Sequence, residues 1–537
     1  MSEAPRLLYN NDGSFLLMSA PPMSPDEFVY ESVGRVIGTQ VGRVIVNMFG
    51  FGDAMPWYKT EIPEARPPRN QTYSNLQEYR IQENLHHIWS LDVDVWEMAV
   101  QAAHDAGMEF WPGTRFNDRH GERFAWLTEW RVSHPEYNIP KDCTEGRYGV
   151  PGGPRGLNYA LPEVRAWKIK LMEEACTRYD VDGFELDLMR EPMVSFTDIE
   201  MGRAILTEFL ADCRAALNRI GEKRGRPLGF GIRTAATPEA TQEMGLDLEA
   251  VLEQRSVTTI SPSVYWDTST DAPYDRFVEM ARGKDCHVYA CPSEEIGPGP
   301  QYVPASNEAL RGAAYNAWHQ GVDGIYIFNF NHNPTCNVDA AELFAQLGHT
   351  ETLRYRDKRF AVTGNAEMIS KYDTGVVERG YMESYHSSGS HYSSFEHQLP
   401  VSLDETPTGP GRIIDLLVYD DLKTAAERGM LKSVILEITV AGSTKDDAFE
   451  FKLNGHRLPD PESPEFHLYS QYHMGPRWNG MQGNYALRYN LHKGELLKQG
   501  TNEVELTLRK RNPLIDCDFL IHDIFLDVTY HNLTMRG

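Results

Sequence analysis

The sequence lacks the features that mark several large classes of protein. No basic segment followed by an apolar run opens the chain, and no uninterrupted apolar stretch is long enough to cross a bilayer. Basic residues are outnumbered, 52 against 77 acidic ones, which gives a formal net charge of −25. That sign disfavours nucleic acid and anionic membranes as partners. We therefore expect a cytoplasmic protein, or a secreted or periplasmic one if a leader is missing from the sequence given.

Cysteine is scarce and scattered along the chain. The seven cysteines form no Cys-x-x-Cys pair and no cluster with histidine at zinc spacing. We expect free thiols in a reducing compartment, with one Cys286–Cys291 bridge as the alternative. The chain also has no glycine-rich phosphate loop and no serine nucleophile elbow. The sequence therefore predicts a site without a metal or a cofactor.

Short apolar runs do alternate with helical patterns from about residue 43 onward, which is typical of a parallel sheet with crossover helices. An eighth strand is suspected within 121–161, where the periodicity is poor. The seven clear apolar runs and this suspected strand together predict a (β/α)8 barrel over residues 1–350. A doubly wound open sheet is the alternative, disfavoured because no phosphate turn follows the first strand and polar residues follow many strands. The seven clear runs are Val44–Phe49, Met108–Arg115, Asp182–Arg190, Leu228–Thr234, Thr258–Asp267, His287–Pro292 and Val322–Asn331.

The sequence changes character past about residue 350. Helical periodicity fades, and short alternating segments bounded by turn residues replace it. Asn454-Gly455 between two apolar runs is a strong hairpin signal. These features predict an antiparallel, jelly-roll-like β-sandwich over residues 351–537. The Ser-, His- and Tyr-rich segment 371–399 is interpreted as a linker or a return strand.

The predicted strand that contains Glu185 and Asp187 is the centre of the candidate site. Period-2 geometry places these two carboxyl groups on one face, opposite three apolar side chains. Buried carboxylates need hydrogen bonds, cations or a polar cavity. Asp187, nearest the strand's end, is the predicted nucleophile or charge-stabilising carboxylate, with a structural salt bridge to Arg233 or Arg115 as the alternative. Glu185 is expected to orient Asp187 or bind a hydroxyl, or to form a structural ion pair.

Polar and aromatic side chains follow the other predicted strands, where the active site of such a barrel lies. Glycosidic cleavage needs a second carboxyl group as proton donor, and Asp267, Glu294 and Glu295 remain equal candidates. Acids and amides suit sugar hydroxyls, and aromatic faces suit pyranose rings. The predicted substrate-binding residues are Glu185, Arg115, Asn117, Asp118, His120, Arg190, Arg233, Tyr265, Trp266, Asn329 and Asn331.

Two stretches resemble the glycoside-hydrolase-like β/α-barrel proteins. Leu157–Arg165, leading into Tyr179–Asp187, is similar to their Pro-Glu-Val-Arg helix and the Asp-Gly strand after it. Trp318–Ile325 looks like their last helix and strand. The resemblance implies a glycosidase that acts on an oligo- or polysaccharide. Residues 454–455 and 500–506 resemble the accessory β-sandwiches of carbohydrate-active enzymes, which bind sugar or brace the barrel, and bracing is our expectation.

Two better-known patterns overlap the central strand imperfectly. The α-amylase-like pattern Asp-Gly-Phe-Arg-x-Asp places its nucleophile on Asp187, but Glu185 replaces the arginine and Arg233 stands where those enzymes place their acid. The chitinase-like pattern Asp-Gly-x-Asp-x-Asp-x-Glu places its acid on Met189. That departure disfavours an N-acetyl-assisted mechanism unless Glu191 takes the role.

The sequence thus predicts a glycoside hydrolase that uses Asp187 and an acid from a later strand. Two other functions stay open. One is a carbohydrate-binding barrel without catalysis. The other is a lyase or isomerase in which Glu185 and Asp187 bind a divalent ion with Asp118 or Asp267 as a third oxygen ligand.

Overall fold

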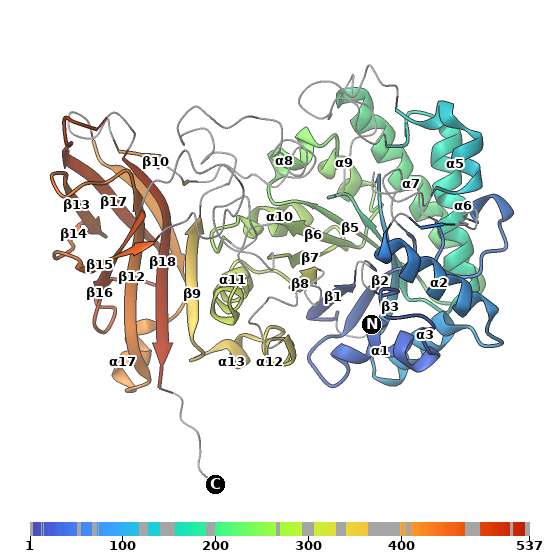
Figure 1. The fold of residues 1–537 in the computed structure, drawn as a ribbon, viewed down its shortest axis with the longest axis horizontal. Coiled ribbons are helices and arrows are strands. Elements are labelled where there is room, and N and C mark those ends of the chain that lie inside the picture. Colours follow the sequence, from blue (N-terminus) through green and yellow to red (C-terminus); the bar gives the residue numbers. More distant parts are fainter. Residues whose placement is uncertain are drawn as a thin grey trace, which may run out of the picture.

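The structure is a computed structural model, and Figure 1 shows a barrel surrounded by helices with a body of antiparallel strands beside it. Among the described residues, no helix has the length and apolar content needed to span a bilayer. The described residues are 4–11, 13, 16–50, 55–66, 72–73, 75–117, 127–139, 156–189, 199–264, 269–292, 305–328, 340–363, 398–399, 401–403, 410–467, 484–515 and 519–531.

Eight parallel strands close the barrel in chain order. The first strand pairs with both the second and the eighth, so the sheet has no open edge. This confirms the predicted (β/α)8 barrel and rules out the open sheet. The strands are β1 (Leu7–Asn11), β2 (Arg43–Asn47), β3 (Glu109–Arg115), β4 (Gly183–Asp187), β5 (Gly229–Ala235), β6 (Thr259–Ser263), β7 (His287–Ala290) and β8 (Gly324–Phe328).

The eighth strand is not where the sequence analysis placed it. β3 pairs directly with β4, and the described part of 121–161 holds the helix α5 (Glu129–Ser133) and the 3-10 turn η3 (Pro135–Tyr137). The missing strand is β1, at the start of the chain. Its apolar run is only three residues long, because Asn10 and Asn11 follow, and so it gave no recognisable strand pattern.

The helices follow the strands as the alternating pattern predicts. Polar caps define the starts of several of them: Asp94 accepts hydrogen bonds from the backbone N–H groups of Trp96 and Glu97, and Ser306 accepts one from that of Ala309. The helices around the barrel are α1 (Pro25–Ser32), α2 (Leu76–Ser90), α3 (Val95–Asp105), α6 (Pro162–Arg178), α7 (Ile199–Arg224), α8 (Pro238–Glu243), α9 (Leu248–Glu253), α10 (Tyr274–Ala281) and α11 (Asn307–His319), followed by α12 (Ala340–Phe344) and α13 (Thr350–Leu353).

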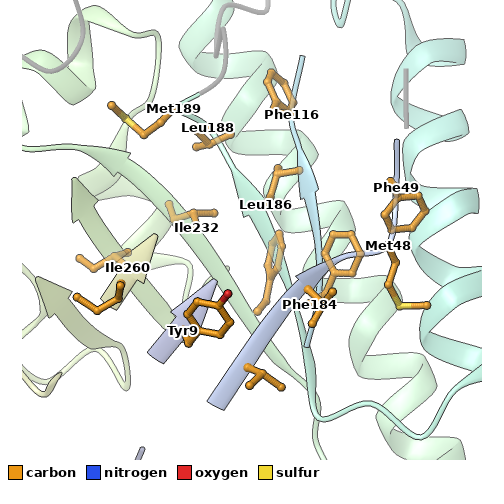
Figure 2. Close-up of a cluster of buried hydrophobic side chains, with 14 of the residues drawn as sticks. Tyr9, Met48, Phe49, Phe116, Phe184, Leu186, Leu188, Met189, Ile232 and Ile260 are labelled. Atoms are coloured by element: carbon orange, nitrogen blue, oxygen red, sulfur yellow. The ribbon is translucent and has the colours of Figure 1, made fainter. Parts of the chain in front are cut away.

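The main apolar core lies between the outer face of the barrel and these helices. Phe184 and Leu186 of β4 point into it, beside Ile232 of β5 and Ile260 of β6 (Figure 2). Because successive side chains of a strand alternate between faces, this packing turns Glu185 and Asp187 toward the barrel interior. The core therefore fixes the orientation of the candidate site.

Glycines make room for large aromatic rings inside the barrel, below the carboxyl groups. A Cβ atom on Gly229 would lie 2.2 Å from Cζ2 of Trp111, and one on Gly183 would lie 2.4 Å from Cε2 of the same ring. Gly324 leaves room for the ring of Tyr289 in the same way, since its Cβ would lie 2.6 Å from that ring. Trp111 and Tyr289, both buried, thus fill this part of the barrel.

The C-terminal strands form two antiparallel sheets around one apolar core, as the sequence predicts. In one sheet the order is β10-β18-β12-β16-β15, with β9 also paired to β18, and in the other it is β11-β17-β13-β14. Segment 371–399 lies outside the described residues except for Gln398 and Leu399. The strands are β9 (Lys358–Thr363), β10 (Val401–Ser402), β11 (Arg412–Val418), β12 (Leu431–Ala441), β13 (Ala448–Leu453), β14 (His456–Arg457), β15 (Glu462–His467), β16 (Asn484–Asn490), β17 (Gly500–Lys510) and β18 (Leu520–Tyr530).

The sandwich is docked on the barrel through α11, which lies beside β9 in Figure 1. The two backbones meet closely, because a Cβ on Gly312 would lie 2.2 Å from the carbonyl oxygen of Arg359. Asn316, fully buried, donates hydrogen bonds to the carbonyl groups of Thr270 and Leu417 at 2.9 and 2.8 Å. One amide therefore joins the barrel to the sandwich, and the bracing role stays a prediction.

We predict that Gly229→Ala lowers the free energy of unfolding by about 1–3 kcal/mol, because the added methyl group overlaps the Trp111 indole. Gly231→Ala is the matched control, since its Cβ would lie 3.2 Å from the same ring. Chemical denaturation of both variants measures the difference. An equal loss in the two would show that the indole moves freely and does not fill this space rigidly.

Candidate functional site

The candidate site is a group of polar side chains inside the barrel, contributed by four of its strands. Glu185 and Asp187 come from β4 and Arg233 from β5, while Ser263 ends β6 and Asn10 lies on β1. All five side chains are buried. Because these positions face inward from a closed sheet, each charge or hydrogen-bonding group must find its partner within the barrel.

Asp187 and Arg233 form a buried bidentate ion pair. Nε of Arg233 donates to Oδ1 of Asp187 at 3.0 Å, and Nη2 donates to Oδ2 at 2.8 Å. The two side chains are only 5% and 2% exposed. The backbone N–H of Met189 donates a third hydrogen bond, to Oδ1 at 2.9 Å. Of the two salt-bridge partners that the sequence left open, the structure selects Arg233.

Further contacts hold the Arg233 guanidinium in place. Its Nη1 donates to Oγ of Ser263 at 3.0 Å, and its Cζ lies 3.7 Å from the centre of the Phe328 ring. The group is therefore bonded along two edges and covered on one face. Arg233 was also a predicted substrate-binding residue. Its charge is engaged by Asp187, and a direct contact with substrate stays a prediction.

Glu185 has a different environment from Asp187, although both lie on the same face of β4. Its Oε1 accepts hydrogen bonds from the Tyr326 hydroxyl at 2.6 Å and from Nδ2 of Asn10 at 3.2 Å. Burial raises the pKa of the Glu185 carboxyl to about 7, against the lowering effect of the Tyr326 hydrogen bond. A large fraction of Glu185 is therefore protonated at neutral pH.

Sequence reasoning missed Asn10 and Tyr326 as members of this site. Asn10 lies in an opening stretch that gave no strand signal. Tyr326 lies in Gly-Ile-Tyr-Ile-Phe, where its neighbours are apolar and nothing distinguishes it from a core residue. The period-2 alternation of β8 does turn Tyr326 inward, opposite Ile325 and Ile327, and that signal could have placed it.

The structure places two more of the predicted residues. Arg115 is paired in register with Asp187 and is buried at the end of β3. Asn117 uses its amide on the backbone of Leu157, donating to the carbonyl oxygen at 3.1 Å and accepting the N–H at 2.7 Å. Asn117 therefore fastens the segment before α6 to the end of β3. Substrate contacts of both residues stay predictions.

Most other predicted residues cannot be placed, because they lie outside the described residues. Met189, where the chitinase-like pattern carries its acid, is described: its side chain packs in the apolar cluster with Leu188 (Figure 2). This position therefore departs from the chitinase-like pattern in its apolar surroundings as well as in its residue type. The predicted residues that lie outside the described residues are Asp118, His120, Arg190, Glu191, Tyr265, Trp266, Asp267, Glu294, Glu295, Asn329 and Asn331.

The cysteines in the described part of the chain are free thiols. Cys176, Cys213, Cys286 and Cys291 are free thiols there, so the alternative Cys286–Cys291 bridge is not formed. Burial raises the pKa of Cys291, which lies near Arg233 and Ser263, to about 11. Within the described ranges, no group of three His, Cys, Asp or Glu side chains is arranged to hold a metal ion.

No protein-family model and no curated protein matches the sequence. Solved structures do align with it. A chitinase from a Paenibacillus species has 12% identity and a TM-score of 0.39, and this chain covers 32% of it with 65% of its own length. A family 18 N-acetylglucosaminidase from Paenibacillus barengoltzii has 11% identity and a TM-score of 0.37, over 64% of this chain and 100% of the other.

An α-L-fucosidase isoenzyme from Paenibacillus thiaminolyticus aligns with 14% identity and a TM-score of 0.39, over 64% of this chain and 48% of the other. This chain thus spans about a third of the chitinase and about half of the fucosidase. Identities and scores this low add nothing to the closed barrel that the strand pairing establishes. The fold is a (β/α)8 barrel with an appended β-sandwich.

We predict that the wild-type protein loses stability relative to Glu185→Gln as the pH rises from about 4.5 to above 7. The folded-state pKa of Glu185 is about 7 against an ordinary value of 4.5, so the folded protein binds the extra proton in this window and the unfolded chain does not. The difference reaches the order of 3 kcal/mol. Urea denaturation at several pH values measures it.

Glu163→Gln, an exposed change on α6, is the control and should follow the wild-type pH dependence. If Glu185→Gln also ran parallel to the wild type between pH 4.5 and 8, Glu185 would be an ordinary carboxylate in the folded protein.

Proposed function

We propose that this protein is a glycoside hydrolase that cleaves an oligo- or polysaccharide with two carboxyl groups. One observation carries the proposal: an ion-paired carboxylate, Asp187, and a carboxyl group with a pKa near 7, Glu185, lie two residues apart on the inner face of β4. Two acids in such different environments can take different roles: here Asp187 reacts and Glu185 supports it, and the second reacting carboxyl group comes from a later strand. The inner face of a (β/α)8 barrel, toward the carboxyl ends of its strands, is where such chemistry takes place.

Asp187 is the nucleophile or charge-stabilising carboxylate in this proposal. Arg233 and the Met189 N–H fix its position, so its oxygens need no reorganisation during the reaction. Oδ2 accepts a single hydrogen bond from the described residues, from Nη2 of Arg233. That oxygen retains a lone pair for the anomeric carbon or for the positive charge of an oxocarbenium-like transition state.

The proton donor comes from a later strand in this proposal. Asp267, Glu294 and Glu295 remain the candidates, and the structure does not separate them because they lie outside the described residues. Glu185 supports Asp187 and binds a substrate hydroxyl. Glu185 and Asp187 of β4 thus form the polar centre of the site, and the acid comes from one of the segments that follow β6 or β7.

A carbohydrate-binding barrel without catalysis is the second candidate, and one observation favours it. Met189 is apolar and buried at the place where the chitinase-like pattern carries its acid, while Arg233 neutralises Asp187. A barrel of this kind would bind sugar and leave the glycosidic bond intact. Turnover of any glycoside separates the two candidates.

We predict that Asp187→Asn lowers kcat by about 10³-fold or more while leaving sugar binding within a few-fold, because the amide can neither attack nor carry the negative charge. Initial rates on a panel of nitrophenyl glycosides and plant or marine polysaccharides measure turnover, and calorimetry measures binding. Retained turnover in this variant would remove Asp187 from the reaction.

Asp182→Asn is the matched control, since Asp182 directly precedes β4 and pairs with Arg226 at 2.8 Å. This change should leave kcat unchanged. Circular dichroism of both variants checks folding, because breaking a buried ion pair costs about 3–5 kcal/mol. The double variant Asp187→Asn/Arg233→Gln provides a second form without an unpaired buried charge.

We predict that chelating agents leave this activity unchanged, because the proposed reaction uses side chains alone. Rates before and after dialysis against EDTA, with and without added magnesium, measure the effect. Loss of activity on chelation and its return with magnesium would instead support the metal-dependent lyase or isomerase, in which Glu185 and Asp187 bind the ion.

A further inference from the structure

The two oxygens of the Glu185 carboxyl group are not equivalent. Oε1 accepts both hydrogen bonds that the group receives, from Tyr326 and from Asn10. No described residue donates a hydrogen bond to Oε2. A carboxyl oxygen has two lone pairs, so the two donors together occupy Oε1. Oε2 is left as the atom that can carry a proton.

The opposite placement of the proton would leave a buried group unsatisfied. If Oε1 carried it, Tyr326 would have to accept that hydrogen bond and turn its own O–H elsewhere. Within the described residues, the Tyr326 hydroxyl has Glu185 as its one hydrogen-bond partner, and Tyr326 is fully buried. A buried hydroxyl without an acceptor costs about 1–3 kcal/mol, which favours Tyr326 as the donor.

We propose that Tyr326 and Asn10 are positioning residues that place the proton of Glu185 on Oε2, so that Glu185 acts as a hydrogen-bond donor to a substrate hydroxyl. Its use with a sugar rests on the proposed function, whereas the position of the proton does not. A neutral carboxylic acid can donate where a carboxylate can only accept. Two carboxyl groups of one strand then offer opposite chemistry, an acceptor at Asp187 and a donor at Glu185.

Charged and titratable groups on the surrounding strands act on Glu185 together. Asp187 on its own strand raises the pKa of Glu185, whereas Arg233 of β5 and Arg43 of β2 lower it. Cys291, which follows β7, interacts with Glu185 and stays a thiol at neutral pH. The Tyr326 hydrogen bond from β8 lowers the pKa of Glu185, because it stabilises the ionised form. Removing that hydroxyl should therefore raise the pKa of Glu185.

The experiment compares Tyr326→Phe with Tyr289→Phe in the full-length protein. Both tyrosines are buried inside the barrel, but the Tyr289 hydroxyl donates to the carbonyl oxygen of Pro5 at 2.7 Å and leaves Glu185 untouched. Infrared difference spectra across a pH titration report the C=O stretch of the protonated carboxyl group. The band is assigned by its loss in Glu185→Gln.

In Tyr326→Phe we expect the C=O stretch to move to higher frequency, because the carbonyl oxygen, Oε1, loses its shorter hydrogen bond. We also expect the titration midpoint to rise by about one pH unit. Tyr289→Phe should match the wild type in both readouts. Asn10→Ala, which removes the 3.2 Å bond, should shift the band in the same direction by less.

An unchanged C=O frequency in Tyr326→Phe would place the proton on Oε1 and overturn the proposal. Equal shifts in Tyr326→Phe and Tyr289→Phe would overturn it too, since they would reflect general loosening of the barrel. Both readouts work without turnover. A protein that cleaves no glycoside but shows the expected infrared shifts would fail the proposed function and keep this inference.

Discussion

The interior of this barrel depends on the neutralisation of buried charge. Arg233 and Asp187 are both almost inaccessible to water, and neither could be buried alone, because an unpaired ion there costs several kcal/mol. Each satisfies the other, and Ser263, Phe328 and the backbone N–H that follows β4 complete their contacts. The ion pair fixes β5 against β4 and leaves a negative oxygen held in a defined position.

Glu185 is accommodated by the opposite means. No cation among the described residues is in direct contact with it, so burial favours its neutral form, and hydroxyl and amide donors from β8 and β1 hold one of its oxygens. Below it, aromatic rings packed against glycines fill the barrel and restrict the space around the carboxyl groups. The two acids of one strand therefore differ because different strands supply their partners.

The described residues of the β-sandwich contact the barrel at α11. Close backbone contact at Gly312 and the hydrogen bonds of Asn316 hold α11 against β9. The buried Lys358–Asp420 pair, with Tyr530 donating to the same carboxylate, lies within the sandwich near this interface. Because α11 immediately precedes β8, the strand that carries Tyr326 and Phe328, bracing this helix also supports the side of the barrel that holds Glu185 and Arg233.

The sequence by itself determined the barrel, the sandwich and the inward face of β4, because periodicity and turn residues are local signals that one segment carries alone. It could not locate β1, whose apolar run is three residues long. Nor could it show that Asp187 pairs with Arg233 while Glu185 meets Tyr326 and Asn10. Those partners lie 46 to 175 residues away along the chain. Only closure of the barrel brings them together, so that one acid forms a buried ion pair while burial favours the neutral form of the other.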